Sequence, residues 1–394
     1  MKLLEFGHLP YWAGGMQSSG GANAIFQIAY HLSQKKDVKV SFGATDVYNE
    51  KMQYDDMVVY GWTKWTLIKF CLLHFILATK CLNYTLSFKR RFPDTVGFVH
   101  RLVLSIFHVY VTHRVKPDII HLHNDPVFYS DLLCKYAKIV VTAHGIFGND
   151  KSVVNYKFHN QYENYIIRNK NISLITFVTN AIKKEYENTR GSIIPANVVI
   201  LNAYDNSKFF YQEKQSTDKL VLCTIASVSD RKGQTRVING ISLSGINCKY
   251  ICVGNGTEEG INAIKKLAAT KNVDLLYLGK KTPDEIREVL TQSDFMILPS
   301  SSEGFGLVYL EAMACGTPII LPKDLPIVQE EKIISSTNSI LLEDCTEGSI
   351  ANALKNINNS CFNRKNVSMS VEGYSWDTIT EQYLNEMKKI NPEE

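Results

Sequence analysis

The amino-acid sequence predicts an α/β protein with two Rossmann-like, doubly wound domains that face a central cleft. Short apolar runs alternate with helical patterns along the chain, which is typical of parallel sheets covered by helices on both faces. This alternation restarts after a polar stretch at residues 204–219. The 394 residues are about twice what one domain usually needs. Because such sheets bind ligands at the carboxyl ends of their strands, a cleft between two of them is the expected binding site.

The order of the expected elements supports a boundary near residue 205. The first half carries strand-like runs that read KLLEFG, VKVSFGA, DIIHLH, KIVVTAH and ISLITFVT, and a helix GGANAIFQIAYHLSQ follows the first of them. The second half carries LVLCTIASV, KYICVGNG, DLLYLGK and DFMILPS. We therefore expect an N-terminal domain over residues 1–205 and a C-terminal domain over 206–394. A last helix at about 375–390, with Ser375 as its N-cap, can pack back on the N-terminal domain.

Composition excludes several classes of protein. The hydrophobic fraction of 45% is that of a globular protein, and a net charge of +4 is too small to indicate a nucleic-acid partner. Nine cysteines, with no C-x-x-C pair, indicate reduced thiols rather than a disulfide or metal framework. The start, MKLLEFGHLPYW, lacks the features of a signal peptide, and no run of about 18 apolar residues occurs. We expect a cytoplasmic protein.

Residues 61–116 combine basic and apolar side chains. The only acid among them is Asp94, and the apolar runs WTLIKFCLLHFILAT and LVLSIFHVYV lie between the basic positions. Helices of this kind bind the inner surface of a membrane through apolar burial and attraction to anionic headgroups. Ordinary core helices with solvated basic ends are the alternative. The basic residues are Lys64, Lys69, Lys80, Lys89, Arg90, Arg91, Arg101, Arg114 and Lys116.

The stretch SSSEGFGLVYLEAMACGTPII, at residues 300–320, sets two carboxylates eight positions apart. It follows an expected strand, and its Gly-punctuated turn leads into good helix formers. The free N–H groups and positive end of such a helix bind anions, and Gly304 and Gly306 let an anion approach the backbone. Glu303 lies in the turn and Glu311 about two helical turns further on. A ligand with hydroxyl groups on both sides of a phosphate, such as a nucleotide sugar, suits both carboxylates.

These residues resemble the E-x7-E signature of family 4 of the retaining glycosyltransferases with the GT-B fold, the glycosyl transferases group 1. The resemblance covers most of the chain and is weakest over about residues 45–115. It implies that Glu303 lies by the donor sugar and that Glu311 holds the ribose hydroxyls of the nucleotide. It also implies that the amides of Phe305, Gly306 and Leu307, in the turn that Gly304 opens, bind sugar and phosphate. The donor then binds the C-terminal domain and the acceptor the N-terminal domain.

A second segment, TIASVSDRKGQ, resembles the loop whose Arg and Lys neutralise the diphosphate in that family. Lys232 matches the family Lys, whereas the family Arg falls on Ser227. Arg231 or Arg236 is the candidate for the missing positive charge.

Further matches lie in the N-terminal domain. Gly20 and Gly21 open the first helix and resemble the family's glycine pair, whose amides face the donor phosphate. His123 and His144 each end an expected strand, at positions where related enzymes place a histidine near the donor sugar. Without the resemblance, a plain loop and two satisfied core histidines would be the simpler interpretation.

The resemblance implies a retaining hexosyl transfer from a nucleotide sugar, with a UDP- or GDP-sugar as donor, to a glycan acceptor. Lys232 and the helix amides would stabilise the departing diphosphate, and we assign Glu303 and His123 with Lys232 to the catalytic set. No D-x-D occurs, so neither a metal nor any other cofactor is expected. The basic apolar region favours a lipid-linked glycan acceptor and a role in bacterial surface polysaccharide synthesis, such as O-antigen or lipopolysaccharide. The alternatives are a sugar-nucleotide epimerase of the same fold and a non-catalytic partner subunit.

Overall fold

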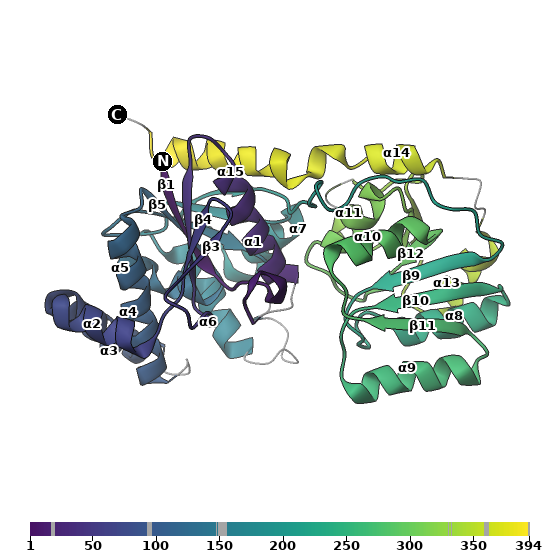
Figure 1. Ribbon diagram of the computed structural model, residues 1–394, viewed down its shortest axis with the longest axis horizontal. Helices are drawn as coiled ribbons and strands as arrows, with labels where there is room; N and C mark the ends of the chain where they lie inside the picture. Colours follow the sequence, from purple (N-terminus) through teal and green to yellow (C-terminus); the bar gives the residue numbers. More distant parts are fainter. Residues whose placement is uncertain are drawn as a thin grey trace. The chain divides into compact units, whose positions relative to one another are not determined.

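A computed structural model gives the fold of residues 1–16, 20–92, 97–146, 148, 156–329, 331, 333–357 and 362–392. Asp94 and one of the nine cysteines, Cys361, lie outside these described residues. The chain divides into an N-terminal unit, residues 1–201 with 379–394, and a C-terminal unit, residues 202–378. Each unit contains one sheet with helices packed against it (Figure 1).

The sheet of the N-terminal unit is mixed. Its eight described strands lie in the order β3-β4-β2-β1-β5-β6-β7-β8, and only β3 and β4 pair antiparallel. The antiparallel hairpin was not expected from the sequence, which predicts a parallel sheet. Its two strands are short and half exposed, so their apolar pattern is too weak to be recognised. The strands are β1 (Lys2–Gly7), β2 (Lys39–Ala44), β3 (Lys51–Tyr54), β4 (Met57–Tyr60), β5 (Ile119–His123), β6 (Lys138–Ala143), β7 (Leu174–Phe177) and β8 (Ala196–Val199).

Helices of the N-terminal unit surround this sheet (Figure 1). The last helix, α15 (Trp376–Ile390), belongs to this unit from residue 379 onward, and its Glu381 carboxylate lies 2.7 Å from the Lys35 ammonium. Short 3₁₀ turns occur at Tyr11–Ala13 and Asp125–Tyr129 in this unit and at Glu372–Tyr374 in the C-terminal unit. The other helices are α1 (Gly20–Ser33), α2 (Lys64–Leu73), α3 (Phe75–Arg91), α4 (Phe98–Val115), α5 (Ser130–Leu133), α6 (Tyr156–Arg168) and α7 (Asn180–Arg190). Of these, α2 and α3 pack on α4 rather than on the strands.

The C-terminal unit has a parallel sheet whose strand order is β11-β10-β9-β12-β13-β14. The order reverses between β9 and β12, and ligands in such sheets bind at this reversal. The strands are β9 (Leu220–Ile225), β10 (Cys248–Val253), β11 (Asp274–Gly279), β12 (Phe295–Ile297), β13 (Ile319–Pro322) and β14 (Ser339–Leu342). The helices are α8 (Gln234–Ser244), α9 (Glu258–Thr270), α10 (Pro283–Gln292), α11 (Leu307–Ala314), α12 (Pro326–Gln329), α13 (Glu347–Lys355) and α14 (Arg364–Met369).

Residues 61–116 form three helices with different surroundings. Helix α4 is largely buried, and the Arg101 guanidinium is fully buried, 4.9 Å from the centre of the Phe88 ring and 3.3 Å from the Tyr129 hydroxyl. The expectation that this arginine belongs to a basic surface is therefore wrong, because aromatic rings of the core enclose its charge. Helices α2 and α3 lie on the surface instead, where they expose apolar side chains to solvent.

Among the described residues, no single helix is both long and apolar enough to cross a bilayer. Only α2 and α3 taken together reach the required length and composition, and a bend of 111° separates them. The eight described cysteines are all free, and five of them are buried.

Candidate functional site

The candidate donor site of the C-terminal unit lies on the loops that follow β9 and β12. These strands are neighbours, with Phe295 beside Leu222 and Met296 beside Cys223. Their carboxyl ends therefore present two loops side by side, although more than 60 residues separate these loops in the sequence. The first loop carries Lys232 and the second carries Glu303.

The two loops are joined by charged groups. The Lys232 ammonium donates a hydrogen bond to Oε1 of Glu303, and the side chains of both residues are only 13% and 10% exposed. The guanidinium of Arg231 donates to the carbonyl oxygen of Ser302 at 2.6 Å and lies 3.8 Å from the same carboxylate. Burial lowers the pKa of Lys232, while its bond with Glu303 opposes that shift. The structure thus brings together Arg231, Lys232 and Glu303.

The second basic candidate, Arg236, already uses its guanidinium in hydrogen bonds to the backbone of the two loops. Its guanidinium donates to the backbone oxygens of Asp230 at 2.8 Å and of Pro299 at 3.0 Å. Such bonds hold the β9–α8 loop against the β12–α11 loop. Arg231, which is half exposed and next to Glu303, is therefore the better candidate for the charge that Ser227 does not supply.

Helix α11 begins at Leu307, and its N-cap is Gly306. The glycine has a φ of +80°, and no side chain caps the helix start. A Cβ at Gly306 would lie 2.6 Å from the Tyr309 ring, whose hydroxyl is anchored to the carbonyl oxygen of Leu298 at 3.1 Å. Only glycine fits this turn without strain. The uncapped N–H groups at the helix start are those that an anion can use.

The remaining predicted residues of this segment differ in exposure. Gly304 is exposed, whereas the Phe305 side chain is buried at 4% exposure, so only the backbone of Phe305 is open to a ligand. Glu311 lies about one turn into α11 rather than two, because the helix begins only at Leu307, and it is partly buried. Burial, and then the nearby charge of Asp205, raises the pKa of Glu311 to about 7.

If Glu311 holds the ribose hydroxyls of a nucleotide, as the resemblance implies, this raised pKa makes nucleotide binding depend on pH. Ribose hydroxyls donate hydrogen bonds, and an ionised carboxylate accepts them more strongly than a protonated one. We therefore expect the Kd of UDP, or of GDP if that base is the correct one, to fall as pH rises from 6 to 8. The expected change is up to about tenfold per pH unit below the pKa. Isothermal titration calorimetry across this range, with Glu311→Gln as the control, measures the effect; an equal slope in the variant would exclude Glu311 as the source.

The N-terminal unit carries the other predicted residues. Gly20 and Gly21 are the first two residues of α1, and His123 ends β5. Nδ1 of His123 lies 3.0 Å from Nε2 of His144, which follows β6. The structure thus places the two histidines in contact.

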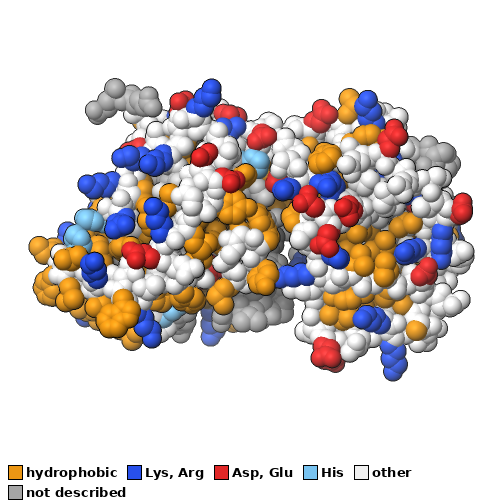
Figure 2. Space-filling model, viewed as in Figure 1, with side chains coloured by type: hydrophobic (Ala, Val, Ile, Leu, Met, Phe, Trp, Pro, Cys, Tyr) orange, Lys and Arg blue, Asp and Glu red, His pale blue; other side chains and the backbone are white. Residues whose placement is uncertain are grey.

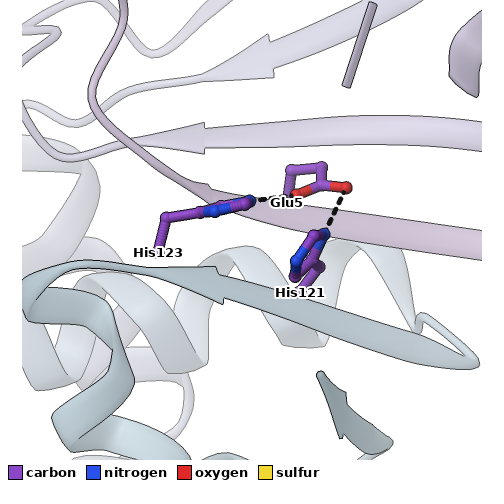
Figure 3. A group of neighbouring side chains, drawn as sticks. All are labelled: Glu5, His121 and His123. Carbon is purple, nitrogen blue, oxygen red and sulfur yellow. Dashed lines mark hydrogen bonds and ion pairs between the residues drawn. The ribbon is translucent and has the colours of Figure 1, made fainter. Parts of the chain in front are cut away.

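A buried carboxylate beside these histidines was missed in the sequence. Glu5 extends from β1 with one oxygen 2.9 Å from Nε2 of His123 and the other 3.0 Å from Nδ1 of His121 (Figure 3). All three side chains are fully buried, and their polar atoms lie within 4.8 Å of one another, close enough to hold a metal ion. The acid inside the apolar run KLLEFG was the signal that could have revealed Glu5, because an unpaired carboxylate is costly in a buried strand.

A known protein family matches most of the C-terminal unit. Residues 205–368 match the model of the family described as glycosyl transferases group 1. This segment is a glycosyl transferases group 1 domain. It contains all the candidate residues of the C-terminal unit, from Asp205 to Glu311.

Curated relatives resemble parts of the chain. The N-acetyl-alpha-D-glucosaminyl L-malate synthase of Bacillus anthracis is 28% identical over 228 residues, which are 53% of this chain and 58% of that protein. The GPI3 subunit of a phosphatidylinositol N-acetylglucosaminyltransferase from Saccharomyces cerevisiae is 29% identical over 139 residues, 32% of this chain and 30% of the relative. The matched segment thus spans little more than half of the first relative and less than a third of the second.

Solved structures match almost the whole chain. Sucrose-phosphate synthase from Thermosynechococcus elongatus superposes with a TM-score of 0.75 at 15% identity and covers 99% of both chains. HepE from Anabaena, solved with UDP and glucose, gives a TM-score of 0.71 at 14% identity and covers 99% of this chain and 100% of its own. These likenesses, with the two α/β units, confirm the expected fold class: the chain has the GT-B fold.

Proposed function

We propose that this protein is a glycosyltransferase that moves a sugar from a nucleotide-sugar donor to a glycan acceptor. The observation that carries the proposal is the contact of Lys232 with Glu303 beside the uncapped start of α11. This arrangement offers positive charge, free N–H groups and a carboxylate at one point of a glycosyl transferases group 1 domain. A diphosphate needs the first two, and a sugar hydroxyl needs the third.

Each group has one role in the proposed transfer. Lys232 and the amides of Gly306 and Leu307 stabilise the negative charge that develops on the departing diphosphate. Preorganised donors of this kind are often the largest catalytic contribution. Glu303 accepts hydrogen bonds from the donor sugar, and Glu311 accepts them from the ribose hydroxyls.

We propose that the N-terminal unit binds the acceptor. The amides of Gly20 and Gly21 face the donor phosphate in this proposal, and His123 and His144 lie near the donor sugar. The spacing of the two glutamates resembles that of retaining enzymes, so we propose retention of anomeric configuration in a hexosyl transfer. UDP- and GDP-sugars are the proposed donors, and no metal or other cofactor is required.

The proposed acceptor is a lipid-linked glycan in bacterial surface polysaccharide synthesis, met at the inner face of the cell membrane. Support comes from the surface of α2 and α3. Figure 2 shows hydrophobic side chains, with Lys and Arg among them, over the region that these helices occupy in Figure 1. We call the following exposed residues the α2–α3 apolar face: Trp65, Ile68, Leu72, Leu73, Phe75 and Ile76.

Thermal unfolding with a panel of nucleotide sugars tests donor binding. A ligand at about 100 times its Kd stabilises the folded state by about 2.7 kcal/mol, enough to raise Tm by several degrees. We expect one nucleotide class to stabilise the wild type but not Glu311→Ala, whereas Glu343→Ala, at an exposed acid of the same unit, should respond like the wild type.

A negative result would favour a different function. If no nucleotide sugar shifts the Tm of the folded wild type, the absence of an arginine at Ser227 has emptied the donor site. A non-catalytic partner subunit would then be the better proposal. Release of the nucleotide from a bound donor with no transfer to any acceptor would instead favour an epimerase.

A further inference from the structure

A chain of hydrogen bonds runs through the interior of the N-terminal unit and ends at one free atom. From Glu5 it passes to Nε2 of His123 at 2.9 Å, and from Nδ1 of His123 to Nε2 of His144 at 3.0 Å. The remaining ring atom, Nδ1 of His144, is covered and has no hydrogen-bond partner among the described residues. His144 as a residue is partly exposed although its Nδ1 is covered, so this end of the chain lies nearer the surface of the unit than Glu5 does. We call Nδ1 of His144 the open end because it lacks a partner in the described part of the protein.

A second branch leads from Glu5 in the other direction. Its other oxygen lies 3.0 Å from Nδ1 of His121, whose Nε2 lies 2.7 Å from the hydroxyl of Thr142. That hydroxyl is 2.7 Å from the hydroxyl of Thr176. This branch ends among buried hydroxyl groups and has no open atom. Figure 3 shows the carboxylate of Glu5 between the two rings, which project from the neighbouring strand β5.

The bonds of the first branch can all point in either of two directions. If Glu5 is ionised, His123 and His144 both carry their proton on Nε2, and Nδ1 of His144 is a free acceptor. If Glu5 is protonated, it donates to His123, both rings carry their proton on Nδ1, and the free atom becomes a donor. Every internal bond is satisfied in both arrangements, and both rings stay neutral.

We propose that Glu5, His123 and His144 form a proton relay. A proton that arrives at Nδ1 of His144 moves the Nε2 proton of that ring to Nδ1 of His123. The Nε2 proton of His123 then moves to Glu5, so one proton enters at the open end and one is stored at the buried carboxylate. Glu5 thereby acts through His123 as a positioning residue, because its protonation decides whether His144 accepts or donates.

Burial supports this exchange. It lowers the pKa of His121, His123 and His144 to about 3, so these rings stay uncharged near neutral pH. It raises the pKa of Glu5, and the hydrogen bond from His123 opposes the shift. Among the described residues, a further titratable group that faces the cluster is Tyr383 of α15, whose ring centre lies 5.7 Å from that of His121 and whose pKa burial raises to about 12. Glu5 is therefore the group whose protonation changes.

The contact of the open end with a ligand rests on the proposed function. We propose that Nδ1 of His144 exchanges a hydrogen bond with a hydroxyl group of the bound sugar. A sugar hydroxyl both donates and accepts, so it suits either state of the relay.

Nuclear magnetic resonance of the ¹⁵N-labelled histidines in the full chain tests the relay. As pH falls, the protons of His123 and His144 should move from Nε2 to Nδ1 in one common step, with neither ring becoming charged. The proton of His121 should stay on Nδ1 throughout. Single histidine-to-asparagine variants assign the signals.

Two variants separate the relay from a general effect on the fold. In Glu5→Gln the common step should disappear, because an amide does not titrate. Thr142→Val, which alters only the closed branch, should keep it. Separate protonation of the two rings in the wild type, or a common step that persists in Glu5→Gln, would overturn the relay, and the wild-type titration decides even if a variant fails to fold.

Two further measurements complete the test. UDP-glucose should shift the Nδ1 signal of His144 and UDP alone should not. If both ligands bind without moving that signal, the sugar contact is wrong although donor binding stands; if neither these nor GDP and GDP-mannose bind, the proposed function itself has failed. The wild type and Glu5→Gln are also incubated with zinc and dialysed. If the wild type retains one zinc ion per chain and Glu5→Gln retains none, Glu5, His121 and His123 form a metal site in place of the relay.

Discussion

Replacing Lys232 with methionine should lower kcat/KM for glycosyl transfer by about 100- to 1,000-fold while the protein stays folded. Methionine keeps an unbranched side chain, one atom shorter than that of lysine, and carries no charge, so the developing charge on the diphosphate loses one preoriented donor. The partner Glu303 keeps Arg231 at 3.8 Å and is not left without positive charge. Steady-state kinetics with the donor found by thermal unfolding, together with Tm, measure the effect.

A second lysine pair in the same unit provides the control. Lys323 contacts Glu343 in a similar way, but these side chains are 41% and 80% exposed, against 13% and 10% for Lys232 and Glu303. Exposed pairs contribute little to stability, so Lys323→Met should leave both kcat/KM and Tm nearly unchanged. Equal losses of activity in the two variants would show that the effect of Lys232 is not local.

A double variant that combines Lys232→Met with Glu303→Gln shows whether Lys232 and Glu303 act together. If Glu303 only occupies Lys232 in the absence of ligand, Glu303→Gln should free the lysine for the diphosphate and lower the Kd of UDP. If both groups also hold the donor, the losses of the single variants should not add up in the double variant. Lys232→Met with normal kcat/KM would exclude the assignment of this lysine to the leaving group.

The sequence allows the closeness of the candidate residues in the C-terminal unit to be predicted, because the strand topology determines it. Once β9 and β12 are recognised as parallel strands, their loops meet at the reversal of strand order, and Lys232 must lie near Glu303. The turn at Gly306 is likewise local, since a positive φ at a helix start favours glycine. The pKa of Glu311 was not predictable, because it depends on burial and on Asp205, which is distant in the sequence.

The N-terminal unit shows the opposite case. Glu5 is bonded to residues more than 110 positions away, and nothing in its own neighbourhood reveals that partnership. The burial of Arg101 could not be predicted for the same reason, since its partners Phe88 and Tyr129 come from other helical segments. A basic residue in an apolar helix indicates either a surface or an aromatic enclosure, and only the tertiary structure distinguishes these.

The α2–α3 apolar face should bind anionic membranes, and two charged substitutions should abolish that binding. Leu72 and Phe75 are 79% and 76% exposed on either side of the bend between the helices. Each apolar side chain that enters the bilayer interface gains about 1.5–3 kcal/mol, so Leu72→Glu with Phe75→Glu should weaken binding at least about 100-fold. Cosedimentation with vesicles of phosphatidylglycerol and phosphatidylcholine measures it.

The charges around the face predict which lipids bind. Lys64, Lys69, Lys80, Arg90 and Arg91 are exposed on these helices, and residues 61–92 contain no acid. Each basic side chain near an anionic surface contributes about 1 kcal/mol, and salt screens this attraction. Binding should therefore be weak on vesicles of phosphatidylcholine alone and should fall as salt is raised.

A matched control shows whether any exposed apolar side chain is sufficient for vesicle binding. Leu243 on α8 is 58% exposed in the C-terminal unit, so Leu243→Glu should leave vesicle binding unchanged. If the wild type does not bind anionic vesicles but forms a dimer that Leu72→Glu with Phe75→Glu dissociates, the face is an interface between copies of the chain. Binding to the vesicles would instead bring the proposed acceptor site to lipid-linked glycans at a surface, where α2 and α3 lie along the headgroups because neither helix can span the bilayer singly.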